Sequence, residues 1–146
     1  MIGYVDSSVL VRLLLDEPEP FPGIADLEAR VTSTLTQVEC LRAVDSALHH
    51  GQLDDDEYSE RRTAVFSLMR RMRLVAVSPL VLRRAGEPLP APLRTLDAIH
   101  VATALRWRER HDSDLAFVTH DRRQGKVAQL LGFEAIGIDD GATSWS

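Results

Sequence analysis

The 146-residue chain contains one cysteine, Cys40, and few aromatic residues, which make up 5% of the sequence. A single cysteine excludes an internal disulfide framework. The apolar runs are much too short to cross a membrane. The first residues, MIGYVDSSVL, lack the basic region that precedes the apolar segment of a signal peptide. We therefore expect a cytoplasmic protein without a membrane span.

Lysine is also nearly absent, because all but one of the 17 basic residues are arginine, the exception being Lys126. The planar fork of arginine matches phosphate. A GC-rich coding sequence would raise the arginine content whatever the function, so both explanations stay open. The formal net charge of -5 argues mildly against extensive binding of nucleic acid over the whole surface.

Short apolar segments alternate with helical patterns along the chain. Strands are expected at 2–6, 30–34, 74–78, 115–120 and 133–138. Helices are expected from Ser7 or Ser8, at about 24–29, from Thr34 or Thr36 to about 50, at 54–72, 79–86 and about 95–110, and from about 122 to 131. The segment PEPFPG (18–23) should end the first helix.

The expected strands have no polar face, which is typical of a parallel sheet covered by helices on both sides. No repeat, low-complexity tract or long linker divides the chain. We predict a single α/β domain over residues 1–146, with an ordered core at about 2–138 and a loose tail at 139–146.

Four acidic residues fall at or near the carboxyl ends of the strands, where open α/β sheets form their functional crevice. Asp6 ends the first strand and Asp121 follows the fourth. Asp97 opens the helix that leads into the fourth strand, and Glu39 lies on the helix after the second. Because a partly buried carboxylate without a partner is costly, we expect something cationic to meet each one.

Taken singly, each acid has an ordinary structural explanation. Asp6 can be a turn residue, Asp121 a helix cap, and Glu39 an exposed helix residue. Asp97 can be a first-turn acid in a helix that Thr95 caps. Taken together, four acids at one rim favour a site for Mg²⁺ or Mn²⁺, which prefer oxygen ligands. Such an ion can activate water for attack on a phosphodiester.

Histidine and cysteine add little to this picture. His100 lies one turn after Asp97 but is expected to pack beside the helix and to bond locally. The pair His49–His50 lacks the spacing of a zinc site. Cys40 is expected to be a small core residue.

Four segments, YVDSSVLVRLL, TQVECLRAV, LRTLDAIHVATAL and FVTHDRRQGKVAQLLGF, resemble the successive motifs of PIN-domain ribonucleases, and most of all the VapC-type toxins of toxin–antitoxin pairs. The resemblance runs from Ile2 to about Ile138. It implies a three-layer α/β/α sandwich with a five-stranded parallel sheet, and metal-dependent endonucleolytic cleavage of RNA.

The resemblance also implies roles for the four acids. Asp6 and Asp97 would hold the principal Mg²⁺ or Mn²⁺, directly or through water. Glu39 would ligate the metal or orient the attacking water. Asp121 would complete the metal site or serve a second ion.

Accessory residues follow from the same motifs. Thr119 matches a polar residue of the family's T-x-D segment, and Ser7 or Ser8 could bond a carboxylate or a substrate phosphate. Arg122 and Arg123 could contact phosphate, because they enter a helix whose N-terminus favours anions.

Members of this family commonly form homodimers and bind an antitoxin whose C-terminal segment covers the acidic groove, often with an inserted arginine. The resemblance places these contacts on the helix pair around residues 35–72. The apolar residues available there are Leu48, Tyr58, Phe66 and Met69.

The sequence argues against three alternative functions. A haloacid dehalogenase-type phosphatase needs a second acid two residues after the first, where this chain has Ser8. A response-regulator receiver needs an adjacent acid pair in its pocket and a late-strand lysine, neither of which appears. A non-catalytic PIN-like module would bind RNA or a protein without cutting, but the complete set of four acids argues against it.

Overall fold

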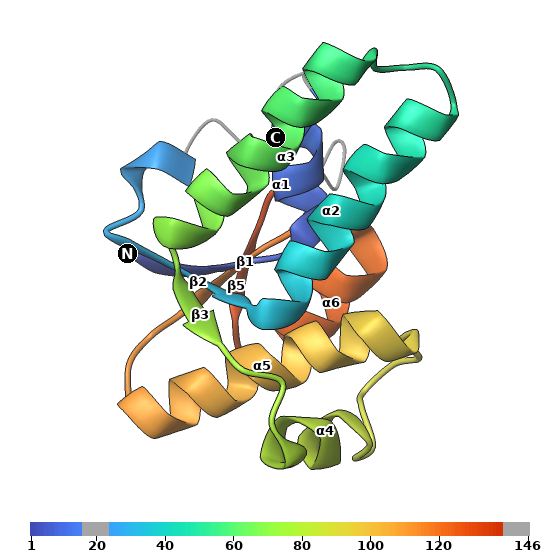
Figure 1. Ribbon diagram of the computed structural model, residues 1–146. Coiled ribbons are helices and arrows are strands. Elements are labelled where there is room, and N and C mark those ends of the chain that lie inside the picture. Colours follow the sequence, from blue (N-terminus) through green and yellow to red (C-terminus); the bar gives the residue numbers. More distant parts are fainter. Residues whose placement is uncertain (16–23, 139–146) are drawn as a thin grey trace, which may run out of the picture.

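The computed structural model describes residues 1–15 and 24–138. Its centre is a five-stranded parallel sheet in the order β3-β2-β1-β4-β5 (Figure 1). The strands are β1 (Ile2–Val5), β2 (Ala29–Ser33), β3 (Arg73–Val75), β4 (Ala116–Val118) and β5 (Glu134–Ile136). They lie within the predicted segments or one residue outside them, and are mostly shorter. The predicted fold class is confirmed.

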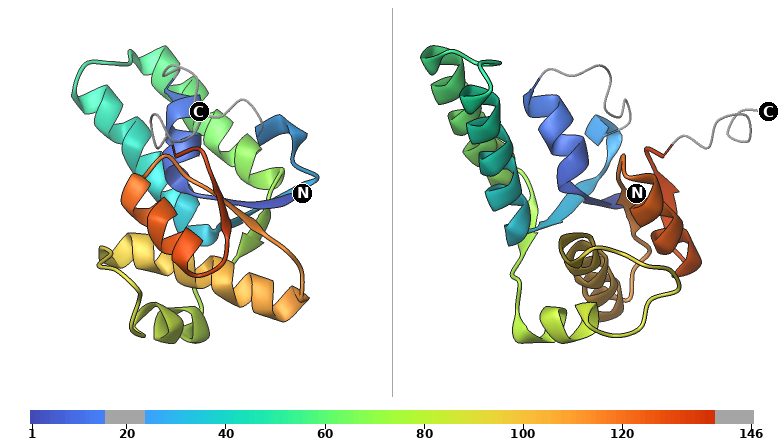
Figure 2. Two further views of the ribbon diagram at one scale, coloured as in Figure 1. Left: turned by 180° about the vertical axis from the view of Figure 1, so that it is seen from behind. Right: turned by 90° about the vertical axis from the view of Figure 1, so that its right-hand side faces the viewer.

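Helices cover both faces of this sheet (Figure 2). The helices are α1 (Ser7–Leu14), α2 (Thr34–His49), α3 (Asp55–Arg70), α4 (Pro79–Ala85), α5 (Thr95–His111) and α6 (Arg122–Leu130), with a 3-10 turn, η1, at Ile24–Asp26. Helices α1, α2 and α3 pack together on one face, whereas α5 and α6 lie on the other. Helix α4 packs against α5. Within the described ranges, no helix combines the length and apolarity needed to cross a membrane.

The two halves of the core arise from the alternation of side chains along β1 and β4. Tyr4 pairs with Phe117 in the sheet, and their rings stack at 5.3 Å in the cluster under α5 and α6. Val5 pairs with Val118, and both join the cluster under α1, α2 and α3. All four side chains are fully buried, and each contributes about 1.5–3 kcal/mol of hydrophobic free energy. The central strands are therefore anchored on both faces.

The sequence predicts helix caps at Ser7 or Ser8, at Thr34 or Thr36 and at Thr95, and all three are wrong because each cap lies one or more residues earlier. Asp6 caps α1 by accepting from the Ser8 amide, and Ser33 caps α2 by accepting from the Leu35 amide. Helix α5 begins at Thr95, with Arg94 in the cap position and no side-chain cap bond. In the first two cases the strand passes directly into the helix, so the last residue of the extended segment takes the cap.

Two predictions lie outside the described residues. One is the break at 18–23, and the other is the loose tail at 139–146.

Candidate active site

The site lies at the carboxyl ends of β1 and β4, which are neighbours in the sheet. Asp6 directly follows β1, and its amide donates to the Val118 carbonyl at 2.9 Å. Thr119 and Asp121 follow β4. This pairing places Asp6 beside Thr119, although 113 residues separate them in the chain.

Asp6 is almost fully buried, with 3% of the residue exposed. Its Oδ2 accepts from the Ser8 amide at 3.1 Å and from the Thr119 hydroxyl at 3.2 Å. Its Oδ1 accepts from the side-chain amide of Gln124 at 3.3 Å. Both oxygens therefore have defined donors, which hold the carboxylate in one orientation.

Gln124 connects three of the predicted acids. It is fully buried on α6, and its Oε1 lies 2.8 Å from Thr119 Oγ1, whose single hydrogen is shared between this oxygen and Asp6 Oδ2. Its Nε2, which bonds Asp6, also lies 3.4 Å from the Asp97 carbonyl oxygen. Its backbone amide donates to Asp121 Oδ1 at 2.9 Å, which is the cap of α6. Asp121 is thus a cap, as one reading of the sequence proposed, and it is also tied to the site.

Glu39 reaches the site from α2 through His100 of α5. His100 is fully buried, and its Nε2 lies 2.5 Å from Glu39 Oε1 and 3.7 Å from Asp6 Oδ1. Burial alone would lower the pKa of His100, but the bond to Glu39 and the charges of Asp6, Glu39 and Asp97 outweigh it and raise that pKa. His100 therefore does more than pack, because it is the hydrogen-bonding partner of Glu39.

Asp97 lies in the first turn of α5, and 22% of its side chain is exposed. Arg94 pairs with it, with 3.6 Å between Arg94 Nε and Asp97 Oδ2. Burial, and then the charges of Asp121 and Asp6, raise the pKa of Asp97, while Arg94 and His100 oppose the shift. The repulsion shows that these three carboxylates act on one another.

A hollow of about 550 Å³ opens beside Asp97 and Asp121. Its remaining lining is basic and comprises Arg94, His120, Arg122 and Arg123. The predicted accessory residues Arg122 and Arg123 therefore lie beside the acids, and Arg94 joins them. Acidic and basic side chains therefore line the same hollow.

The predicted hydroxyl residues differ in what they contact. Ser8 Oγ accepts from the His120 amide at 3.1 Å and bonds the Thr119 hydroxyl at 3.3 Å. Ser7 is buried in the first turn of α1. Gly137 allows β5 to end close to this network: its φ is +97°, and a Cβ there would lie 2.6 Å from the Thr119 carbonyl oxygen.

The chemistry of this donor set fits a hard divalent cation, because all four predicted ligands are carboxylates. As the side chains stand, however, no group of three histidine, cysteine or acidic side chains among the described residues is arranged to hold one ion. The structure thus brings the four acids to one rim, but metal ligation remains a prediction.

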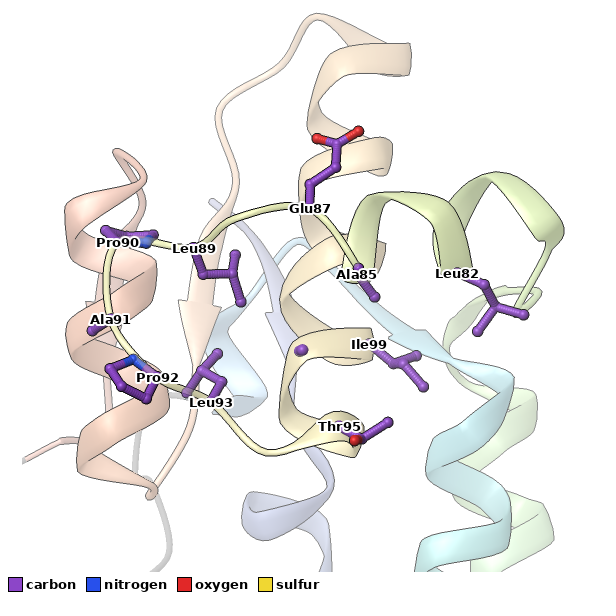
Figure 3. A pocket seen from close by; sticks show the side chains of 12 residues that line it. Leu82, Ala85, Glu87, Leu89, Pro90, Ala91, Pro92, Leu93, Thr95 and Ile99 are labelled. Carbon is purple, nitrogen blue, oxygen red and sulfur yellow. The ribbon is translucent and has the colours of Figure 1, made fainter.

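A larger hollow lies elsewhere in the described chain. It measures about 680 Å³ and lies between α4, the following loop and the start of α5 (Figure 3). Its lining is mainly apolar, with Leu82, Leu89, Leu93 and Ile99 among its side chains. None of the four acids lines it, so size does not identify the candidate site here.

Sequence reasoning missed three site residues. The three-residue spacing from Asp121 to Gln124 is that of a cap and its N3 position, which could have indicated Gln124. Arg94 stands three residues before Asp97, a spacing at which side chains meet on a helix. Tyr4, which bonds His100 Nδ1 at 2.7 Å, had no local signal.

The parallel sheet with acids at its carboxyl edge defines a PIN-like α/β fold. The PIN domain family model matches residues 3–130, and the chain belongs to this family. It is 36% identical to "Ribonuclease VapC46" of Mycobacterium tuberculosis over 137 residues, covering 91% of this chain and 95% of the relative. It is 32% identical to "Ribonuclease VapC47" of the same species, covering 89% and 92%.

Solved structures show the same fold. A toxin–antitoxin complex from Klebsiella pneumoniae aligns with a TM-score of 0.60 at 17% identity, covering 84% of this chain and 88% of that one. VapBC2 from Rickettsia felis, bound to a promoter DNA fragment, aligns with a TM-score of 0.61 at 12% identity, covering 87% and 93%. At these identities the likeness concerns the fold alone.

Proposed function

We propose that this protein is a metal-dependent endoribonuclease that hydrolyses RNA phosphodiester bonds and acts as the toxin of a toxin–antitoxin pair. The observation that carries the proposal is the convergence of Asp6, Glu39, Asp97 and Asp121 on one edge of the sheet. The ribonuclease names of the relatives support the reaction class.

In this proposal Asp6 and Asp97 hold Mg²⁺ or Mn²⁺, and Asp121 completes the site. The bound ion supplies Lewis-acid chemistry and lowers the pKa of water. Glu39, whose side chain is 22% exposed, would ligate the ion and orient the attacking water. Arg94, Arg122 and Arg123 bind the RNA phosphates through charge-assisted hydrogen bonds at the rim.

The proposed partners are an antitoxin that covers the acidic hollow and a second copy of this chain, both in the cytoplasm. Support comes from the structural neighbours, which are toxin–antitoxin complexes. On α2 and α3, Val38 and Phe66 expose 55% and 36% of their surface and are available for such contacts. Met69, at 3% exposed, belongs to the core and is not available.

The test is the substitution Asp97→Asn, which is nearly isosteric and removes one ligand charge. We expect Mn²⁺-dependent cleavage of RNA to fall by at least about 100-fold, because a ligand is lost, with the circular dichroism spectrum unchanged. Asp112→Asn is the matched control at the other end of α5. Asp112 is exposed with φ +45°, a conformation that asparagine tolerates, so this variant should cleave normally.

Two results would refute the metal-site proposal: cleavage by Asp97→Asn at the parent rate, or cleavage by the parent in excess EDTA. A parent that retains RNA in a gel-shift assay but cuts none with Mg²⁺ or Mn²⁺ would establish the alternative, a non-catalytic PIN-like binding module.

A further inference from the structure

His100 occupies a closed position between two hydrogen-bonding partners. Its Nδ1 lies 2.7 Å from the Tyr4 hydroxyl and its Nε2 lies 2.5 Å from Glu39 Oε1. Both Tyr4 and His100 are fully buried. The ring therefore bonds at both ends and cannot reach RNA or solvent.

The roles of the ring nitrogens follow from the partners. An ionised carboxylate only accepts hydrogen bonds, so Nε2 must carry the hydrogen that Glu39 receives. Nδ1 then pairs with the Tyr4 hydroxyl, which can donate or accept. Tyr4 is itself fixed, because it is stacked on Phe117 at 5.3 Å and meets the edge of the His100 ring at 5.9 Å.

Glu39 needs such a restraint more than the aspartates do. Asp6 and Asp121 are short side chains that cap α1 and α6. Glu39 has a longer side chain within α2, so more rotamer freedom must be lost to hold its carboxylate in one orientation. The His100 bond selects the rotamer that directs Glu39 toward Asp6, since the same Nε2 lies 3.7 Å from Asp6 Oδ1.

We propose that His100, held by Tyr4, is a positioning residue that fixes the carboxylate of Glu39 in the hydrolytic site. The inference rests on the proposed function and deepens it. His100 acts through Glu39 and does not touch substrate. The arrangement matches the outer-shell partners of metal sites, whose loss commonly costs about 10- to 100-fold in metal affinity or activity.

Three variants test this inference. His100→Met removes the donor and keeps an unbranched side chain of similar length. His100→Gln keeps a donor near the position of Nε2. Tyr4→Phe removes only the hydroxyl and leaves the stack on Phe117. His111→Met is the control, because His111 lies on the same helix but away from the four acids. Its Nδ1 hydrogen-bonds the Trp107 carbonyl, and its ring stacks on the Trp107 ring.

RNA cleavage and Mn²⁺ titration calorimetry without RNA are measured on each full-length variant. For His100→Met we expect kcat to fall about 10- to 100-fold with KM unchanged, and the Mn²⁺ Kd to rise. His100→Gln should recover at least half of the loss on a logarithmic scale. Tyr4→Phe should lower kcat about 2- to 10-fold, the equivalent of one hydrogen bond. His111→Met should match the parent.

The calorimetry separates positioning from stability. A variant that is only less folded would bind fewer Mn²⁺ ions with the parent's Kd, whereas loss of positioning raises the Kd at full stoichiometry. The inference is overturned if His100→Met shows the parent's kcat and Kd, if only the stoichiometry falls, or if His100→Gln recovers nothing. A parent that neither cleaves RNA nor binds Mn²⁺ overturns the proposed function, and this inference with it.

Discussion

Gln124→Glu should destabilise the protein in a way that depends on pH. The substitution is isosteric and replaces the Nε2 donor by a carboxyl oxygen. That atom would face Asp6 Oδ1 at 3.3 Å and the Asp97 carbonyl oxygen at 3.4 Å, both of which only accept. Gln124 is fully buried, so water cannot separate the charges.

The magnitude follows from two competing costs. Two unit charges about 3.3 Å apart repel by about 5 kcal/mol at an effective dielectric constant of about 20. Keeping the new glutamate protonated at about pH 7 costs about 4 kcal/mol, given an unfolded-state pKa of about 4.3. The second cost is smaller, so one carboxyl of the pair keeps its proton and the destabilisation at about pH 7 is about 4 kcal/mol.

The sign of the pH dependence is fixed by the same argument. The folded-state pKa of the new glutamate is raised above its unfolded value, so the penalty is absent below about pH 4. It grows by about 1.4 kcal/mol per pH unit above that value. The assay is urea unfolding in EDTA, near pH 4.5 and near pH 7. Gln124→Met, which introduces no charge, should lower the free energy of unfolding by about 2 kcal/mol at every pH, because the side-chain hydrogen bonds of Gln124 are lost.

Gln129→Glu is the matched control, because Gln129 is exposed on the same helix. It should show no pH-dependent penalty. The reasoning is refuted if Gln124→Glu loses the same free energy at both pH values, or if Gln129→Glu shows the same pH dependence.

Two further predictions concern the buried thiol and the cell. Burial, and then the charges of Glu39 and Asp6, raise the pKa of Cys40 to about 12. At about pH 8, Cys40 in the folded protein should therefore react with Ellman's reagent only as fast as the protein unfolds locally. Rapid labelling of the folded protein would contradict this burial. Expression of this protein without the antitoxin should inhibit growth, and the substitution Asp6→Ala should relieve the inhibition. If the parent and Asp6→Ala are equally toxic at equal amounts of soluble protein, measured by immunoblot, the catalytic explanation is wrong.

The fold could be predicted from the sequence because its signals are local. Apolar strands without a polar face, each followed by a helical pattern, require a covered parallel sheet. Strand ends were less predictable. The fourth strand was expected at 115–120 but spans Ala116–Val118, because the chain then turns into the site. The Thr119 amide still donates to the Ile136 carbonyl at 2.9 Å, so the hydrogen bonding between these two segments continues one residue beyond the end of β4.

The network among the site residues could not be predicted in the same way. Asp6 and Thr119 meet only because β1 and β4 are neighbours, and strand order has no local signal in the sequence. Tyr4 and His100 are 96 residues apart, and they meet because α5 covers the face of the sheet on which the Tyr4 side chain lies. The helical spacing of Asp97 and His100 placed both near one end of α5, but it could not show that His100 faces Glu39.

The structural and functional explanations of the acids are compatible, because a carboxylate has two oxygens. Asp121 caps α6 through Oδ1, and this cap bond does not involve its second oxygen. Asp6 caps α1 through Oδ2, while Oδ1 is the atom that Gln124 holds. A cap bond fixes the side chain's rotamer, so it orients the remaining oxygen before any ligand arrives. For Asp6 and Asp121, helix capping and the proposed metal ligation are therefore compatible.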